Sequence, residues 1–181
     1  MKPVRVAVLA FDGISLFHLS VPGLVFGIEP PPPGLSPYAV THCAEAPGAV
    51  HTSQGISINV PQGLAAMRKA EIVIVPSWSE PDATPSPAVV AALLKAHRRG
   101  AQIVGLCLGA FVLGDAGLLD GRQATTHWAA RDVFARRFPA ADFRPEVLYV
   151  EDDNIVTSAG TAAAIDCCLN LVRQRDGADV A

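Results

Sequence analysis

The sequence predicts an α/β protein, a three-layer sandwich in which helices cover both faces of a mostly parallel central sheet. Short apolar runs alternate along the chain with helical segments, which is typical of repeated strand–helix units. The runs at Val4–Ala10 and 71–76 are apolar nearly throughout, as expected for parallel strands buried on both faces. Half of the 181 residues are hydrophobic and 17% are charged, so the chain can bury the core of a single domain.

Each expected element follows from an apolar run and from the residues that bound it. Strands are expected at Val4–Ala10, Tyr38–Ala44, 49–52, 56–60, 71–76, 102–106, 122–126, 143–151 and 154–157. Helices are expected at 15–26, 64–69, 87–99, 128–138 and 161–175, with a further helix from residue 108 to the turn at 117–121. The strands at 49–52 and 56–60 form a hairpin, and the sequence contains no internal repeat and no linker to a second domain.

Several residues mark where these elements begin, bend or end. Ser15 can cap the first helix, and Pro22 inside that helix implies a kink or a second start. Consecutive prolines at 30–33 place 29–37 in an extended surface loop, although such a run can also be a recognition motif for another protein. The pair Asp152-Asp153 predicts the turn between the last two strands.

The stretch between the helix at 87–99 and residue 117 carries the main candidate site. Cys107 directly follows the strand at 102–106 and precedes a helix, with Gly105 and Gly109 on either side. Gly-x-Cys-x-Gly across a strand–turn–helix is the layout of a nucleophile elbow with cysteine as the nucleophile. Glycines that lack a Cβ allow the close approach of strand and helix, so we expect Cys107 to adopt a positive φ. The alternative is an ordinary buried cysteine.

A cysteine at an elbow lies over the N-terminus of the following helix. The dipole and free N–H groups there favour a thiolate, and the amide of Leu108 could form half of an oxyanion site. We therefore expect the pKa of Cys107 to lie below its ordinary value. We also expect Cys107 to be the most readily alkylated of the four cysteines.

A cysteine nucleophile needs a partner that moves its proton, and His127 is the best candidate. His127 follows Thr125-Thr126, at the expected end of a strand, where α/β sheets build their sites. It would then be the general base, and the alternative is a histidine packed at the start of a helix.

Two further loops are expected at the same edge of the sheet. The first contains Asp12 and His18, either of which could face Cys107, although Asp12 before a glycine is also an ordinary turn residue. The second contains Ser77 and Trp78, whose backbone could complete an anion-binding nest and whose indole could form an apolar wall. No two candidate ligands fall at metal-binding spacing, so we expect no metal, and we expect no cofactor.

Charge and cysteine content limit the function classes. The net charge is −3 and the chain has no basic stripe, so we expect weak or no DNA binding by these residues alone. The four cysteines show no metal or disulfide spacing, which favours a reducing cytoplasm. The apolar run near the N-terminus is too short for a signal peptide or a membrane span.

Five motifs in order resemble the ThiJ/PfpI family of the class I glutamine amidotransferase-like superfamily. They are Val-Ala-Val-Leu-Ala-Phe-Asp-Gly from Val6, Leu-Ser-Val-Pro-Gly-Leu-Val-Phe-Gly from Leu19, the long elbow segment from Gly105 to Gly121, Ala-Thr-Thr-His-Trp around His127, and Thr-Ser-Ala-Gly-Thr-Ala-Ala-Ala-Ile-Asp from Thr157. The chain is most similar to the N-terminal domain of GlxA/FtrA-type regulators of the AraC family. This resemblance implies a flavodoxin-like fold and covers the chain from Val4 to about Arg175.

The resembled family has an enzymatic and a regulatory branch. Its enzymes, such as isonitrile hydratase, pair the elbow cysteine with a carboxylate of the first βα loop. The Leu-Ser-Val-Pro match places His18 at that position, so this chain departs from the enzymatic pattern. The regulators sense a small molecule, form dimers, and bind DNA through a C-terminal helix-turn-helix domain.

The first hypothesis is therefore a ligand-sensing, dimerising domain of an AraC-type regulator, with an unknown effector. Its contacts would come from the residues already named: Asp12, His18, Ser77, Trp78, Cys107, Leu108 and His127. The tail at 176–181 resembles a loop that opens another helix, so we expect residues 1–181 to be one domain at the start of a longer regulator. The alternative hypothesis is a cysteine-dependent hydratase or amidohydrolase with Cys107 as nucleophile and His127 as base.

Overall fold

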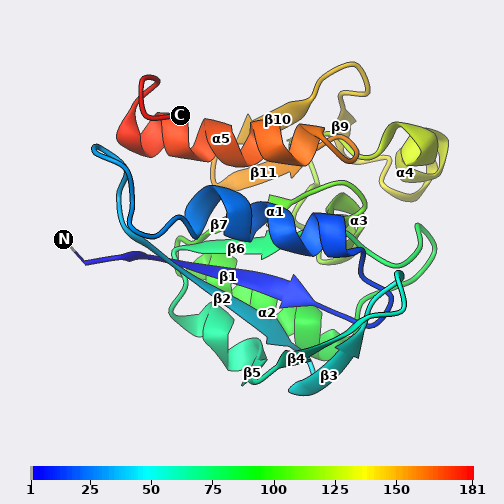
Figure 1. Cartoon of the computed structure of the whole chain (residues 1–181). Coiled ribbons are helices and arrows are strands. Elements are labelled where there is room, and N and C mark those ends of the chain that lie inside the picture. Colours follow the sequence, from blue (N-terminus) through cyan, green and yellow to red (C-terminus); the bar gives the residue numbers. More distant parts are fainter. Residues whose placement is uncertain (1) are drawn as a thin grey trace.

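The chain folds around one large sheet. Its structure, a computed structural model, describes residues 2–181. The strands are β1 (Val4–Ala10), β2 (Tyr38–Ala44), β3 (Gly48–His51), β4 (Ser57–Val60), β5 (Gln62–Gly63), β6 (Ile72–Val75), β7 (Gln102–Gly105), β8 (Gln123–Ala124), β9 (Asp142–Phe143), β10 (Tyr149–Asp152) and β11 (Ile155–Ser158). Seven of them form the main sheet, in the order β10-β11-β7-β6-β1-β2-β5 (Figure 1). Within this sheet, as the structure describes it over residues 2–181, only β10 runs antiparallel to its neighbour.

Helices cover both faces of this sheet. The α-helices are α1 (Leu16–Phe26), α2 (Pro87–Arg98), α3 (Gly109–Asp115), α4 (Arg131–Arg137) and α5 (Ala163–Asp176), and the 3₁₀ helices are η1 (Leu64–Arg68) and η2 (Trp128–Ala130). α1 and α5 lie side by side on one face, and α2 and α3 lie on the other (Figure 1). The predicted three-layer α/β sandwich with a mostly parallel sheet is thereby confirmed.

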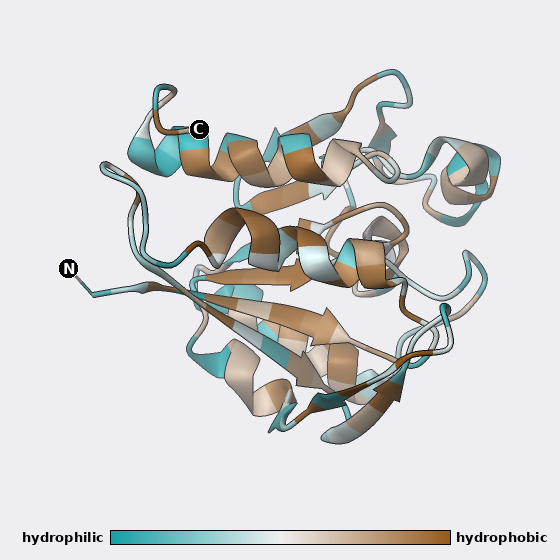
Figure 2. Cartoon of the chain, viewed as in Figure 1, coloured by the Kyte–Doolittle hydropathy of each residue, from teal (hydrophilic) through white to brown (hydrophobic). Residues whose placement is uncertain are grey.

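The two faces of the sheet bury separate clusters of apolar side chains. Val8, Ile74 and Val104 pack toward α1 and α5, whereas Val73 and Ile103 pack toward α2 and α3. Successive side chains of a strand point to opposite faces, so a strand between two helical layers must be apolar throughout. Figure 2 shows this pattern in the central strands, which are hydrophobic along most of their length.

The starts of α1 and α2 agree with the expected boundaries, but their capping differs in detail. Ser86 accepts a hydrogen bond from the N–H of Val89 at 3.2 Å and caps α2 as a serine should. Ser15 occupies the N-cap position of α1, yet its side chain makes no capping bond. Instead, the side chain of Gln54 accepts the N–H of Leu16 at 2.9 Å, so the tip of the β3–β4 hairpin caps α1. α1 continues as one helix through Pro22.

Three sequence expectations in the last third of the chain need correction. The single strand expected at 143–151 is wrong: Pro145, two residues after β9 ends at Phe143, has no N–H to donate, and the chain enters the main sheet only at β10. The helix expected at 128–138 is divided into η2 and α4. The last helix begins at Ala163 rather than at Thr161, because Thr161 has a φ of 49°. In addition, β8 pairs with β9 in a separate two-stranded sheet.

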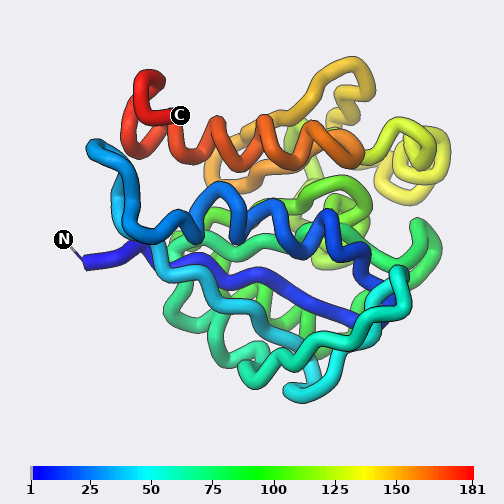
Figure 3. The backbone as a smooth tube through the Cα atoms, in the orientation of Figure 1, coloured from blue at the N-terminus to red at the C-terminus, as the bar shows by residue number. Residues whose placement is uncertain are grey.

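The loop after α1 is tied to the C-terminal end of α5. Ser36 and Tyr38 both donate hydrogen bonds to the carboxylate of Asp176, the latter at 3.0 Å. Figure 3 shows this loop beside the last turns of the chain. At the opposite end of the same helical layer, the N-termini of α1 and α5 lie near the edge where β1, β6, β7 and β11 end. The candidate site lies at that edge.

Within residues 2–181, the structure contains no helix with the length and apolar character required to cross a membrane.

Candidate functional site

The site is built on a sharp turn between β7 and α3. Cys107 has a φ of 54°, in the left-handed region that a residue with a Cβ seldom adopts. Leu108 follows it, and α3 begins at Gly109. The predicted elbow and the predicted positive φ of Cys107 are confirmed.

The two flanking glycines are required by the close approach of strand and helix. A Cβ on Gly109 would lie 2.2 Å from the carbonyl oxygen of Val75, at the end of the neighbouring strand β6. A Cβ on Gly105 would lie 3.0 Å from the backbone of Gly109 and Ala110. Since the obstacles are backbone atoms, they cannot rotate away, and only glycine fits at Gly109 without a shift of α3.

Hydrogen bonds from neighbouring strand ends hold the elbow in place. The N–H of Leu106 donates to the carbonyl of Val75 at 2.9 Å. The hydroxyl of Thr126 donates to the carbonyl of Cys107 at 2.9 Å, and the N–H of Cys107 points to the hydroxyl of Ser158 at 3.4 Å. A strained backbone persists only where its surroundings determine it, and these contacts do so from both sides of β7.

The environment of the Cys107 sulfur has two opposing effects on its pKa. Burial is the larger effect, and it raises the pKa of the Cys107 thiol above its ordinary value. The backbone N–H groups of Thr161 and Leu108 and the hydroxyl of Ser77 act in the opposite direction, because donors stabilise a thiolate. The expectation of a lowered pKa is therefore wrong in direction. A helix N-terminus does not compensate for a side chain that is only 3% exposed.

The sulfur faces a cavity of about 450 Å³, within the size range of small-molecule sites. The residues that line it are Gly13, Ser15, His18, Ser53, Ser77, Trp78, Ser79, Pro81, Cys107, Leu108, His127, Ala129 and Ala130. Six of the seven predicted contact residues are among them, and Asp12 is not. The structure thus brings together loops that are far apart in the sequence, as the arrangement of parallel strands predicts.

His127 is held in one orientation by its neighbours. Its Nδ1 accepts the N–H of Ala129 at 3.1 Å, which caps η2. Its ring packs where Gly160 has no side chain, since a Cβ on Gly160 would lie 2.1 Å from the ring carbon Cδ2. Trp128 stacks on the ring at 5.3 Å between centroids and remains 72% exposed. With Nδ1 accepting a hydrogen bond, neutral His127 carries its proton on Nε2 and offers a donor there.

His18 has no hydrogen-bond partner in the described residues, although both of its ring nitrogens are buried. Burial lowers the pKa of His18, and the nearby His127 lowers it further. Burial also lowers the pKa of His127. Both rings are therefore neutral near neutral pH. A buried polar group without a partner requires an explanation, and in a cavity of this size a ligand is one.

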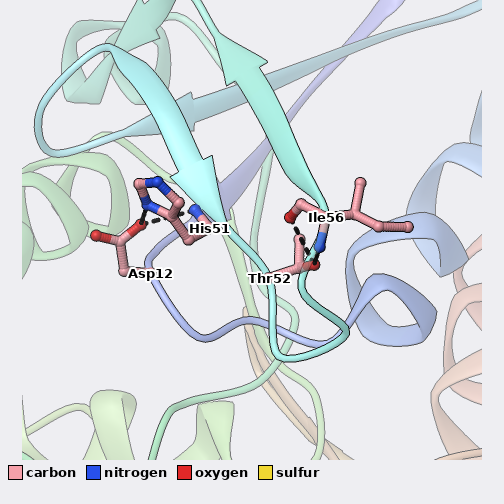
Figure 4. Close-up of polar contacts among 4 residues, drawn as sticks. All are labelled: Asp12, His51, Thr52 and Ile56. Atoms are coloured by element: carbon pink, nitrogen blue, oxygen red, sulfur yellow. Dashed lines mark hydrogen bonds and ion pairs between the residues drawn. The ribbon is translucent and has the colours of Figure 1, made fainter.

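Asp12 has a different role in the structure. Its Oδ1 accepts the N–H of His51 at 2.8 Å and lies 3.3 Å from the Nδ1 of the same residue (Figure 4). These bonds fasten the β1–α1 loop to the end of β3 and lower the pKa of Asp12. Thr52, in the same hairpin, closes its own turn through Ile56. Asp12 lines a separate, neighbouring cavity of about 280 Å³ that shares Trp78 with the first. Its role as a ligand contact stays a prediction.

Sequence reasoning missed two contributions to the site. The hairpin tip brings Ser53 over the cavity, a long-range contact that no local pattern indicates. Thr161 brings its N–H to the sulfur from the loop after β11. The second contribution had a detectable signal, because β11 is a neighbour of β7 and its carboxyl end must lie at the same edge.

The sequence matches the DJ-1/PfpI family over residues 4–174. The chain belongs to the DJ-1/PfpI family. This confirms the resemblance on which the site prediction depends, and a solved structure agrees with it. A ThiJ/PfpI family protein from Pseudomonas syringae superimposes with a TM-score of 0.81 at 26% identity, over 96% of this chain and 69% of the other.

The relatives of this DJ-1/PfpI domain include transcriptional regulators. The regulator CdhR of Pseudomonas aeruginosa is 38% identical over 134 residues, which is 74% of this chain and 40% of CdhR. The regulator GlxA of Rhizobium meliloti is 32% identical over 145 residues, which is 80% of this chain and 44% of GlxA. Both are helix-turn-helix-type regulators, and the chain spans less than half the length of each.

An enzyme is also among the relatives, over a shorter stretch. The isonitrile hydratase of Pseudomonas putida is 40% identical over 79 residues, which is 44% of this chain and 33% of the enzyme. The similarity to regulators therefore extends over more of the domain than the similarity to this enzyme.

Proposed function

We propose that this DJ-1/PfpI domain is the effector-sensing and dimerising domain of an AraC-family transcriptional regulator, and that its effector binds in the Cys107 cavity. The observation that carries the proposal is that the buried ring of His18 has no hydrogen-bond partner in the described residues. Its two buried ring nitrogens lack partners inside a cavity of about 450 Å³ beside the elbow. A small molecule with polar groups would satisfy them. The similarity to the regulators CdhR and GlxA, which covers 74% and 80% of this chain, supports the same proposal.

The chemistry of the site favours binding over catalysis. A catalytic thiol must lose its proton, and burial acts against that at Cys107. His127 accepts the N–H of Ala129 on Nδ1 and holds its own proton on Nε2, so its neutral ring has no free lone pair for a proton from Cys107. His18, at the position of the enzymes' carboxylate, cannot supply a negative acceptor. The hydratase alternative lacks a comparable supporting observation.

The proposed partners of the domain are a second copy of the chain and, through a separate domain, DNA. α1 and the start of the loop after it expose Phe17, Leu24 and Ile28, which are 41%, 68% and 46% accessible. Exposed apolar side chains on one element favour a symmetric contact between two copies. DNA binding would belong to a separate domain, because these residues carry a net charge of −3. The regulator would act in the cytoplasm, where its DNA is.

The proposal is tested by thermal unfolding in a library of small metabolites. A true effector at a hundred times its dissociation constant adds about 2.7 kcal/mol of stability, or roughly 5–10 °C for a chain of this size. His18→Ala should abolish the shift. His51→Ala, the same change outside the cavity, should retain it.

Mass spectrometry of the bound compound separates sensing from catalysis. The compound should be recovered unchanged after prolonged incubation with the protein. Conversion of a bound isonitrile or amide that depends on Cys107 would overturn the proposal in favour of the enzyme. A shift that persists in His18→Ala would place the effector elsewhere.

A further inference from the structure

The polar groups around the cavity share one property: they donate hydrogen bonds, and none is acidic among the lining residues that the structure describes. The ring of His127 offers Nε2–H. His18 offers a ring N–H, and serine hydroxyls are contributed by Ser15, Ser53, Ser77 and Ser79. A cationic group entering this space would meet no counter-charge, and burying an unpaired charge is strongly unfavourable.

The Cys107 elbow carries no negative charge that would repel an anionic ligand. Because burial raises the pKa of Cys107, the sulfur is an uncharged thiol near neutral pH. The N–H groups of Leu108 and Thr161 point toward the same region. Donors arranged around a space without acidic neighbours form a suitable environment for an anion.

We propose that the effector is a small organic acid whose carboxylate lies between His18 and His127, and that His18 takes up one proton when the acid binds. This inference rests on the proposed effector site. The proton comes from the solvent, no bond to carbon is made or broken, and the product is an imidazolium–carboxylate pair. His18 is the ring that takes the proton because its two nitrogens are free, whereas Nδ1 of His127 is occupied.

Within residues 2–181, no other titratable group around His18 competes for this role. Among the described residues that line the cavity, the other titratable groups are the neutral ring of His127 and the thiol of Cys107. From β2, His42 approaches the carbonyl of Leu19 at 3.4 Å. Asp12 in the preceding loop is engaged by His51. On α5, Asp166 lines a different groove beside β10. The acid therefore provides the only new charge that His18 meets.

Acid binding should weaken as the pH rises, because it is coupled to the protonation of His18. The pKa of free His18 lies below its ordinary value, so the free ring is neutral at pH 7 to 8. A bound carboxylate raises that pKa, and binding then consumes a proton. The dissociation constant should increase by up to about tenfold per pH unit as the pH rises above neutrality.

Calorimetry with matched probes tests the inference. The probes are straight-chain monocarboxylates from propionate to octanoate and benzoate, each compared with the amide and the amine of the same skeleton. Titrations at pH 7.5 in two buffers of different ionisation enthalpy report the proton uptake. We expect the acids to bind at least about tenfold more tightly than the amides and the amines not to bind, with close to one proton taken up per acid.

Two variants assign the proton. His18→Gln keeps a donor and an acceptor but cannot be protonated, so acid binding should weaken and its proton uptake should vanish. His127→Gln should retain the uptake even where affinity falls. Loss of the uptake in His127→Gln but not in His18→Gln would overturn the assignment.

The outcomes separate this inference from the proposed function. Amides or amines that bind in a His18-dependent manner leave the effector site intact and overturn the acid. Acid binding without proton uptake overturns the protonation step. If none of the probes binds while a library compound stabilises the protein through His18, the acid class is wrong. If nothing stabilises it, both proposals fail.

Discussion

Buried cysteines lie in two regions of this domain, the helix α5 and the elbow between β7 and α3, and the two regions differ in what surrounds the sulfur. Cys167 and Cys168 lie inside the regular helix α5 and are fully buried. Cys107 is almost as buried, at 3% exposure, but its backbone is strained and its sulfur faces a cavity. Burial raises the pKa of all three thiols. Only at Cys107 do hydrogen-bond donors oppose the effect of burial.

Exposure alone does not distinguish a structural cysteine from a site cysteine. The α5 pair sits among apolar side chains, where a free cysteine behaves as a small hydrophobe. At the elbow, two glycines, a strained φ and three converging donors surround a sulfur of similar burial. Such strain persists in folded proteins chiefly at functional sites.

The largest expected effect comes from breaking the elbow. Gly109→Ala places a Cβ 2.2 Å from the carbonyl oxygen of Val75, and neither backbone segment can rotate away. We expect a loss of at least about 3 kcal/mol in the free energy of unfolding, measured by urea denaturation. Gly23→Ala is the matched control inside α1, since its Cβ meets nothing within 4 Å apart from the backbone of its own helix. It should stabilise the protein by about 0.5–1 kcal/mol. Equal effects of the two changes would refute the steric account.

Alkylation under native conditions sharpens the comparison of the cysteines. Cys107 should react with iodoacetamide at least about a hundredfold faster than Cys167 or Cys168, because the α5 pair is reached only through unfolding. Since burial raises the pKa of Cys107, its reaction rate should increase with pH to a midpoint above the ordinary thiol value. Mass mapping across pH measures both quantities. Labelling of the α5 pair first, or a midpoint below the ordinary value, would contradict the account.

A smaller effect is expected from Gly160→Ala. The new Cβ would overlap the ring of His127, and a side chain can turn away where the backbone facing Gly109 cannot. The domain should remain folded, and affinity for the compound that most stabilises the wild-type protein should fall by about tenfold. Calorimetry measures the loss, and the NMR resonance of the His127 ring reports the displacement. Unchanged affinity with a displaced ring would remove His127 from the binding site.

The smallest expected effect concerns the strain at Thr161. This exposed, β-branched residue has a φ of 49°, which asparagine tolerates better. Thr161→Asn keeps the N–H near the sulfur and should raise the free energy of unfolding by about 1 kcal/mol. Asp153→Asn, at a φ of 58° in a turn, starts from a residue that already tolerates this region and should change stability by less than about 0.5 kcal/mol. A destabilised Thr161→Asn would show that the strain is not relieved there.

Local sequence patterns were sufficient to predict the elbow and the sheet, because the physical causes of both lie in neighbouring residues. The elbow is predicted by Gly105, Cys107 and Gly109. The sheet is predicted by apolar runs, which are typical of parallel strands buried on both faces. The strand expected at 143–151 is interrupted because Pro145 has no N–H to donate to a sheet, and this break has a local signal in the proline itself.

Other features depend on tertiary contacts and had no signal in the sequence. The direction of the Cys107 pKa shift is set by how deeply several loops bury the sulfur. The engagement of Asp12 by His51 and the capping of α1 by Gln54 both depend on the position of the β3–β4 hairpin. A hairpin's placement over a distant loop is decided by packing, not by either segment alone.

The most direct test of the central claim is an NMR titration of the five histidine rings with the stabilising compound. The account predicts that the resonances of His18 and His127 shift together and saturate at one compound per chain. His42, His51 and His97 lie outside the Cys107 cavity and serve as internal controls that should not shift. Saturable shifts of His51 with His18 unchanged would place the ligand in the neighbouring Asp12 cavity and contradict the claim.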